Sequence, residues 1–308
     1  MDAVTVSTST STTALTTATT AAGHTAERSA RSEEAEWVER ANRAEPIESS
    51  RRPNPLAGAQ LFIRYAYPPN SLGYCGPTDS TALLQYGADG TVDHGLTQLA
   101  QAFQGAWPYL ELISRATGIR DPLDHRVVEA YWVGNDLLPA VGLPATAASM
   151  EERFRPRTGR QFPHLLDGVL AGGVPHHSFH VFGVYPWVGL LGDDRKAPRA
   201  LDVLDRCRIR WGRVVHAEGD RVTVSSRPLT LDGHTLAFGD PREESAIRAA
   251  DGLSYLMDLQ PGDFVSLHWD WVCDRLSARQ LAMLRGYTLR QLEITNHRIE
   301  RPGLANAL

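Results

Sequence analysis

Residues 58–204 carry apolar side chains mainly at steps of three and four. This spacing places them on one face of an α-helix. The predicted helices span residues 81–86, 96–103, 109–116 and 127–138. Asp124 has the position of an N-cap for the last of these, and Ser149 with Glu152 has the form of a capping box at a further helix start. We therefore predict a mainly α-helical domain over residues 58–204.

Beyond Arg206 the hydrophobic pattern becomes shorter and alternating. The predicted strands span residues 209–214, 222–224, 229–231, 236–238 and 264–271. Asp232-Gly233 between two such segments is a strong signal for a hairpin turn. Ser277 has the position of an N-cap for a closing helix. The pattern predicts a small OB-like β-barrel with a C-terminal helix over residues 205–298, and hence an α+β fold.

Two segments are predicted to lie outside this folded part. Residues 1–57 run from a Thr/Ser tract into a charged stretch with few apolar side chains, and residues 299–308 form a short tail. Burial of so few apolar groups does not offset the entropy of ordering, so we predict that residues 1–57 are disordered. The charged stretch has the composition of a short helix over residues 33–44.

Composition restricts the classes of function. The 308 residues include 42% hydrophobic side chains and seven Trp, which suffice for a sizeable core. The formal net charge of −5 argues against nucleic acid as the main partner. No stretch approaches the roughly 18 consecutive apolar residues of a membrane helix, so no membrane partner is predicted. Three cysteines without CxxC spacing, and no secretory signal pattern at the N-terminus, are typical of a reducing compartment, so we predict a cytoplasmic protein.

Cys207 and His268 are the leading candidates for a metal site. Each lies on an apolar, strand-like segment, and a thiolate with a neutral imidazole can bind a soft or borderline metal. The positive charges of Arg206, Arg208 and Arg210 are expected to lower the pKa of the Cys207 thiol. The alternative interpretation places both side chains in the core, as a small hydrophobe and a hydrogen-bonded histidine.

The sequence around these two residues resembles the HypC/HupF family of hydrogenase maturation chaperones. The matching motifs are Cys207-x-Ile-x-Trp-Gly-Arg-Val214, Gly219-Asp220-x-Val222, Pro261-Gly-Asp-Phe-Val-x-x-His268 and Leu276 before a helix. The resemblance covers about residues 205–297. Two features depart from the family pattern: Cys207 is internal and so has no free α-amino group, and Trp211 replaces the usual Pro. The whole chain is also similar to actinobacterial proteins of uptake-hydrogenase gene clusters.

The resemblance implies a function and partners. Family members are OB-like barrels that handle the Fe(CN)2CO unit of [NiFe] hydrogenase and pass it from a HypD-type scaffold to the hydrogenase large subunit. By residue match, Cys207 and His268 would hold this iron fragment. The expected protein is thus a maturation chaperone with iron as its transient cargo, and not an enzyme, with the helical domain recognising the partner.

Cys75 supports a different expectation, a cysteine-dependent hydrolase or amidase. Gly76-Pro77 before a helical pattern would place this thiol at a helix N-terminus, where the macrodipole stabilises a thiolate. The rest of such a site would come from one of two histidines and one of two orienting groups: His177 or His180, and Asp79 or Asn135. A third expectation is a non-catalytic protein-binding module.

Three histidines crowd the segment His176-His177-Ser-Phe-His180. On a helix, His176 and His180 would share one face, a spacing that can bind a metal. The alternatives for the cluster, His177 included, are a partner contact or a hydrogen-bonded hinge. Cys273 follows Trp271-Val272 and is expected in the core.

Overall fold

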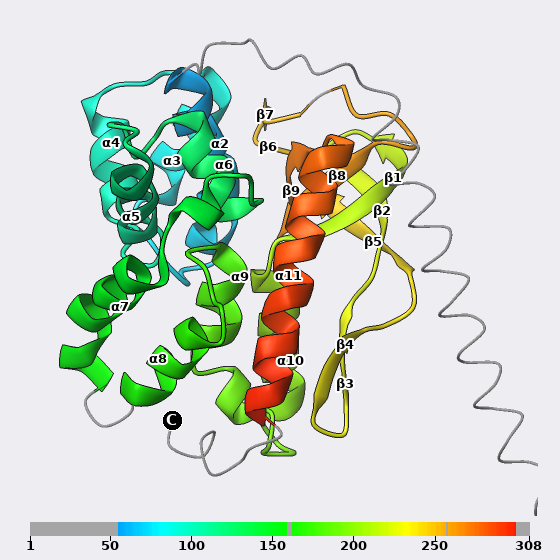
Figure 1. Cartoon of the computed structure of the whole chain (residues 1–308). Helices are drawn as coiled ribbons and strands as arrows, with labels where there is room; N and C mark the ends of the chain where they lie inside the picture. The colour runs from blue at the N-terminus through cyan, green and yellow to red at the C-terminus, as the bar shows by residue number, and fades with distance from the viewer. Residues whose placement is uncertain (1–54, 159–161, 257, 300–308) are drawn as a thin grey trace, which may run out of the picture. The chain divides into compact units, whose positions relative to one another are not determined.

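The computed structural model describes residues 55–158, 162–256 and 258–299 (Figure 1). The predictions for residues 1–54, including the short helix at 33–44, and for residues 300–308 lie outside this range. Residues 55–57, predicted to be disordered, belong to a helix, and so does residue 299 of the predicted tail. The helical elements before the barrel are α2 (Pro55–Ser71), α3 (Ser80–Asp89), α4 (His94–Gln101), α5 (Trp107–Thr117), α6 (His125–Trp132), η1 (Leu138–Ala140), α7 (Leu143–Thr158), α8 (Phe162–Leu170), α9 (His177–Phe179), η3 (His180–Val184), η4 (Val188–Leu190) and α10 (Ala197–Cys207).

The helix boundaries partly follow the sequence signals. Asp124 caps α6 as predicted, because its carboxylate accepts a hydrogen bond of 2.9 Å from the Arg126 amide. This helix ends at Trp132 rather than at residue 138, because Gly134 adopts a left-handed φ of 94°. The capping box at Ser149 is wrong: this residue lies inside α7, which begins six residues earlier at Leu143.

Helix α2 was not predicted, although it connects the helical part to the barrel. It is a 17-residue helix that packs against α3 and α6 on one side and against strands of the barrel on the other. Phe62 and Tyr65 are fully buried. The Tyr65 hydroxyl lies 2.7 Å from the Ser266 hydroxyl, a hydrogen bond between parts of the chain 201 residues apart. The apolar run over this segment therefore forms a buried helix in the centre of the fold.

The second half is a closed barrel with the strand order β1-β2-β5-β9-β8. Its elements, with two small hairpins, are β1 (Arg210–Glu218), β2 (Arg221–Ser226), β3 (Leu229–Asp232), β4 (Thr235–Phe238), β5 (Arg242–Ile247), β6 (Ala249–Ala250), β7 (Leu253–Ser254), β8 (Phe264–His268) and β9 (Trp271–Arg275). Neighbouring strands are antiparallel except for the pair β5 and β9. Alternate apolar residues such as Val222, Val224 and Val265 fill the interior.

Two strand predictions needed correction and one hairpin is confirmed. Strands β3 and β4 turn at Asp232-Gly233, where Gly233 has a φ of 58°. The single strand predicted over residues 264–271 is instead β8 and the start of β9, because Trp269 turns the chain with a φ of 53°. Strand β5 was missed because its sequence, REESAI, buries only Ala246 fully.

The last helix, α11 (Ala278–Ile299), begins where the sequence predicted. The Ser277 amide donates to Gln280 Oε1 at 2.9 Å, and the Gln280 amide donates back to the Ser277 hydroxyl at 3.3 Å. In Figure 1 this helix runs beside the barrel and the segment around α9. The fold is α+β, as predicted, with mainly helical and barrel parts that belong to one compact unit.

The predicted boundary between the two parts, at residues 204 and 205, falls inside α10. Within the described ranges, each helix is too short or too polar to cross a lipid bilayer.

Candidate metal centre

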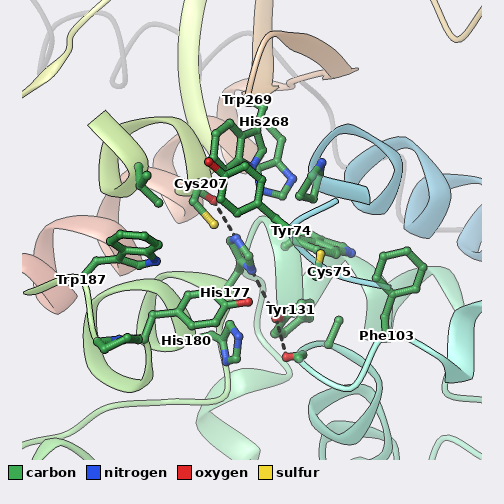
Figure 2. Close-up of a pocket in the computed structure, with 17 residues that line it drawn as sticks. Tyr74, Cys75, Phe103, Tyr131, His177, His180, Trp187, Cys207, His268 and Trp269 are labelled. Atoms are coloured by element: carbon green, nitrogen blue, oxygen red, sulfur yellow. Dashed lines mark hydrogen bonds between the residues drawn. The ribbon is translucent and has the colours of Figure 1, made fainter. Parts of the chain in front are cut away.

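Three potential metal ligands from three separate elements converge beside a pocket (Figure 2). His177 is the first residue of α9, Cys207 the last residue of α10 and His268 the last residue of β8. Their ligand atoms all lie within 4.8 Å of one another, and all three side chains are buried. The structure thus brings together the two residues singled out in the sequence and adds His177 from the histidine cluster.

Cys207 reaches this site from a helix, and its prediction as a strand residue is wrong. Ala200, Val203, Leu204 and Cys207 are buried at steps of three, one and three, which is the pattern of one helix face. The following strand, β1, begins only at Arg210, three residues after Cys207. The helical spacing on the N-terminal side of Cys207 is the signal that would have placed this thiol on a helix.

His268 is held next to Cys207 by the turn between β8 and β9. The Trp269 amide donates a hydrogen bond of 2.8 Å to the Arg206 carbonyl, which ties this turn to the end of α10. His268 Nδ1 lies 2.6 Å from the Tyr65 carbonyl. A carbonyl only accepts, so Nδ1 carries the proton and Nε2 keeps its lone pair. Nε2 is buried and has no hydrogen-bond partner among the described residues.

His177 lies between the backbone of Cys207 and a tyrosine. Its Nε2 is 2.8 Å from the Cys207 carbonyl, and its Nδ1 is 3.2 Å from the Tyr131 hydroxyl. In this arrangement Nε2–H donates to the carbonyl and Tyr131 donates to Nδ1. The Tyr131 hydroxyl also lies 3.2 Å from the Gly105 carbonyl, which offers it a second acceptor.

The other two histidines of the cluster do not form the predicted pair on one helix face. His176 precedes α9 as its N-cap, and its Nδ1 accepts a 3.1 Å hydrogen bond from the Ser178 amide. Its ring stacks on Tyr287. His180 begins the π-helical turn η3, and its Nδ1 lies 3.4 Å from the Tyr109 hydroxyl. His180 lines the same pocket as His177, but neither it nor His176 belongs to the ligand group.

Burial acts in opposite directions on the two kinds of ligand. It lowers the pKa of His177 to about 4 and that of His268 well below the usual value, so both imidazoles are neutral near pH 7. The same desolvation raises the pKa of the Cys207 thiol well above its usual range. The histidines are therefore ready to bind a metal, whereas the cysteine must first lose a proton.

The arginines around Cys207 do not lower its pKa as expected, because each is paired with other groups. Arg206 forms ion pairs with Asp202 and Asp270. Arg208 is buried against Asp205 at 2.8 Å. Arg210 pairs with Glu244 and donates to the Trp269 carbonyl. These pairs cancel the positive charge near the thiol, and its desolvation dominates.

Cys75 lines the same pocket but lacks the features of an activated nucleophile. It lies in the segment between α2 and α3. The N-cap of α3 is Asp79, so the Cys75 thiol is not at the N-terminus of this helix. Burial raises its pKa to about 12, opposite to the expected shift. Asp79 instead caps α3, and Asn135 donates to Glu129 at 2.9 Å. Cys273 is fully buried in β9, as expected for a core residue.

The pocket beside the three ligands has a volume of about 260 Å³. Its walls are mainly apolar, and the aromatic ones are Tyr74, Phe103, Tyr131, Trp132, Tyr185, Trp187 and Trp269. The rings of Tyr74 and Trp269 stack at 4.3 Å, and Arg199 donates to the Tyr74 hydroxyl at 2.7 Å. From the sequence, Tyr131, Trp132, Tyr185 and Trp187 recur at the spacing of core positions, so the core was the preferred interpretation and a groove for a partner the alternative.

Comparison with known proteins places the chain in a family. Residues 54–302 match the family described as "Family of unknown function (DUF6390)". The chain belongs to this family. The matched region contains the whole described barrel, the helical part and all three candidate ligands. No curated protein and no solved structure matches the chain. The resemblance to HypC/HupF chaperones thus stays a prediction.

Proposed function

We propose that this DUF6390 protein is a metal carrier, and more specifically an accessory protein of [NiFe] hydrogenase maturation with the Fe(CN)2CO unit as cargo. One observation supports the carrier role above all: His177, Cys207 and His268 present their ligand atoms within 4.8 Å of one another. The iron cargo and the partners, a HypD-type scaffold or the hydrogenase large subunit, rest on the motif resemblance around Cys207 and His268.

The set of donor atoms restricts the class of metal. One thiolate and two imidazoles favour soft or borderline metals such as iron, cobalt, copper and zinc over calcium or magnesium, which prefer oxygen ligands. The hydrogen bond from His268 to the Tyr65 carbonyl is the kind of outer contact that orients metal-binding histidines. It leaves the lone pair of Nε2 available in a buried position.

His177 can join the site by exchanging its tautomer. On binding through Nε2, the ring gives up its contact with the Cys207 carbonyl and carries its proton on Nδ1. Nδ1–H then donates to the Tyr131 oxygen, and the Tyr131 hydroxyl donates to the Gly105 carbonyl. In this exchange Nε2 releases its proton to water and Nδ1 takes one up. The two hydrogen bonds through Tyr131 remain satisfied, and the Cys207 carbonyl loses its donor.

Two features favour a carrier over a permanent structural site. Structural zinc sites use four protein ligands, whereas this group has three in the part of the chain that the structure describes. The protonated state of Cys207 also works against tight binding, because its raised pKa makes deprotonation costly. Because Cys207 takes up its proton readily, it suits a protein that must release its metal.

The test compares three cysteine variants. Cys207→Ala should abolish the sulfur-to-cobalt absorption on titration with Co²⁺ and should stop hydrogenase maturation in cells. Cys75→Ala is the matched control, since this thiol lines the pocket but lies outside the ligand group. It should leave both readouts unchanged. Cys207→Ser keeps the volume of the side chain. Loss of the sulfur-to-cobalt absorption in this variant would therefore reflect the missing sulfur and not a disturbed fold.

Each half of the proposal has its own refutation. Normal Co²⁺ absorption in Cys207→Ala would exclude this residue as a ligand and overturn the carrier role. Co²⁺ absorption in the wild-type protein that is lost in Cys207→Ala, together with normal hydrogenase activity in that variant, would keep the carrier and exclude the hydrogenase role. Affinity purification of the full chain with metal analysis should recover iron together with a hydrogenase large subunit or a HypD-type scaffold.

A further inference from the structure

The pocket beside the metal ligands is much larger than an ion needs. Its volume of about 260 Å³ lies just below the roughly 300–1,000 Å³ of pockets for drug-sized ligands. The three candidate ligands lie along its wall, so a metal held by them would border this space, and three protein ligands would leave at least one coordination position for another molecule. The space and the open positions together indicate that a second molecule binds next to the metal.

Several polar atoms in the pocket wall lack the partners that buried groups normally have. His180 is about 5% exposed, and its Nε2 is buried without a hydrogen-bond partner in the described structure. The indole nitrogens of Trp132 and Trp269 are in the same state. Native proteins leave few such groups unpaired, so these three, all in the lining of one pocket, point to a ligand that accepts hydrogen bonds.

His180 and Tyr185 mark the polar end of this space. A Cβ atom added at Gly105 would lie 3.0 Å from His180 Nε2 and 3.8 Å from the Tyr185 hydroxyl, so these two groups border the same small volume. The rings of His180 and His177 are 6.3 Å apart. A small molecule on the metal at His177 can therefore reach His180 (Figure 2).

Charge balance determines what kind of molecule fits. A bare divalent metal on one thiolate keeps a charge of +1, and the lining of the pocket contains no carboxylate among the described residues. The buried arginines near Cys207 are already balanced by Asp205 and Glu244. An uncompensated charge in an apolar pocket is costly, so the charge has to be neutralised by the incoming ligand.

We infer that this pocket is a binding site for a small organic anion with an apolar body, which coordinates the metal and accepts a hydrogen bond from His180 or Tyr185. The inference rests on the proposed metal site when it holds a bare divalent metal, and it adds the class of molecule that accompanies that metal. Bound Fe(CN)2CO would bring its own two cyanide anions and would take the place of the organic anion. The apolar body would lie against the aromatic walls, including Trp187.

The test uses the full chain loaded with Co²⁺ and three probes. Benzohydroxamate has an anionic chelating end and an aromatic body, acetohydroxamate lacks the body, and benzamide lacks the anionic end. The change in cobalt absorption measures the affinity of each probe. Benzohydroxamate should bind at least about tenfold more tightly than acetohydroxamate, because its ring makes apolar contacts with the pocket. Benzamide should leave the spectrum unchanged at the same concentrations.

Two wall variants locate the site. Trp187→Ala should reduce the advantage of benzohydroxamate to less than about threefold with the Co²⁺ affinity unchanged. His180→Phe, which keeps a planar ring, should weaken both hydroxamates about tenfold. If His180→Phe does not fold, Tyr185→Phe removes the other polar group at this end of the pocket and serves as the test. His216→Phe, on an exposed part of β1, is the matched control and should change nothing.

The outcomes separate this inference from the proposed function. A cobalt spectrum that no hydroxamate perturbs would overturn the anion site and leave the metal site standing. Equal affinities for both hydroxamates, unaffected by Trp187→Ala, would also overturn it. Absence of any cobalt band in the wild-type protein would overturn the proposed metal carrier itself.

Discussion

The buried histidines make the fold sensitive to acid, and His176 allows this to be measured without replacing any of the three candidate metal ligands. Burial lowers the pKa of His176 to about 3 and that of His177 to about 4. In the unfolded chain both take up a proton below about pH 6.5. Between that pH and the lowered pKa only the unfolded state binds the proton, so stability falls as the pH falls.

The size of this loss follows from the two pKa values. From pH 7 to pH 5, each of these two imidazoles removes about 2 kcal/mol from the free energy of unfolding. His180 and His268 shift in the same direction and add to the loss. A total stability of about 5–15 kcal/mol is usual for a domain, so acidification to pH 5 consumes a large part of it.

His176→Asn isolates one of these contributions. Asn is a good N-cap and can accept the hydrogen bond from the Ser178 amide that His176 Nδ1 accepts now. The variant loses the stacking on Tyr287 at every pH, which shifts its stability by a constant amount. Its loss of stability between pH 7 and pH 5 should be about 2 kcal/mol smaller than that of the wild type.

Urea unfolding, followed by tryptophan fluorescence at pH 7 and pH 5, measures both losses. His216→Asn is the control, because the side chain of His216 is 65% exposed, and it should lose as much stability as the wild type. Equal losses for His176→Asn and the wild type would refute the reasoning, since they would mean that His176 is not held neutral by burial.

Three further predictions concern the thiols and the barrel. Because the pKa of Cys207 is raised, the apparent Co²⁺ affinity should rise about tenfold per pH unit from pH 7 to pH 9; a plateau in isothermal titration calorimetry would mean an already ionised thiol. Iodoacetamide should modify native Cys75 at least about 100-fold more slowly than free cysteine at pH 8, since its pKa is raised to about 12, and fast labelling in a mass-spectrometric time course would restore the hydrolase hypothesis. Gly212→Ala should lower the free energy of unfolding by about 1–3 kcal/mol, because its Cβ would lie 2.3 Å from Val224 Cγ1, whereas Gly192→Ala, with open space around it, should have little effect in the same urea assay.

The parts of the fold that could be predicted depend on local signals. The turn at Asp232-Gly233 and the caps at Asp124 and Ser277 involve neighbouring residues only, and the structure contains all three. Strand β5 is held by pairing with β2 and β9, and its polar sequence carries no local signal for this pairing. The reversal at Trp269 was equally hidden, because a non-glycine residue seldom adopts a positive φ.

The candidate site was only partly predictable for a similar reason. The residue types at Cys207 and His268 indicated metal chemistry, but their convergence depends on the hydrogen bond between the Trp269 amide and the end of α10. The choice among the three clustered histidines depends on the residue at which α9 begins. With His176 as the N-cap, His177 is the first helical residue and lines the pocket. A spacing rule that assumes one continuous helix selects His176 and His180 instead.

If the three candidate ligands hold a metal as proposed, the same burial that neutralises the imidazoles would also favour its release. A metal that enters must displace the proton of Cys207, whose pKa is raised mainly by desolvation. A partner that opens the aromatic cover of Tyr74 on Trp269 would admit water and lower the cost of charge in the pocket. Since hydration stabilises ions, opening would lower the kinetic barrier that a charged metal complex meets on entry and on departure. Docking of a partner at Tyr74, which is 40% exposed, would therefore couple recognition to transfer without any change in the ligands themselves.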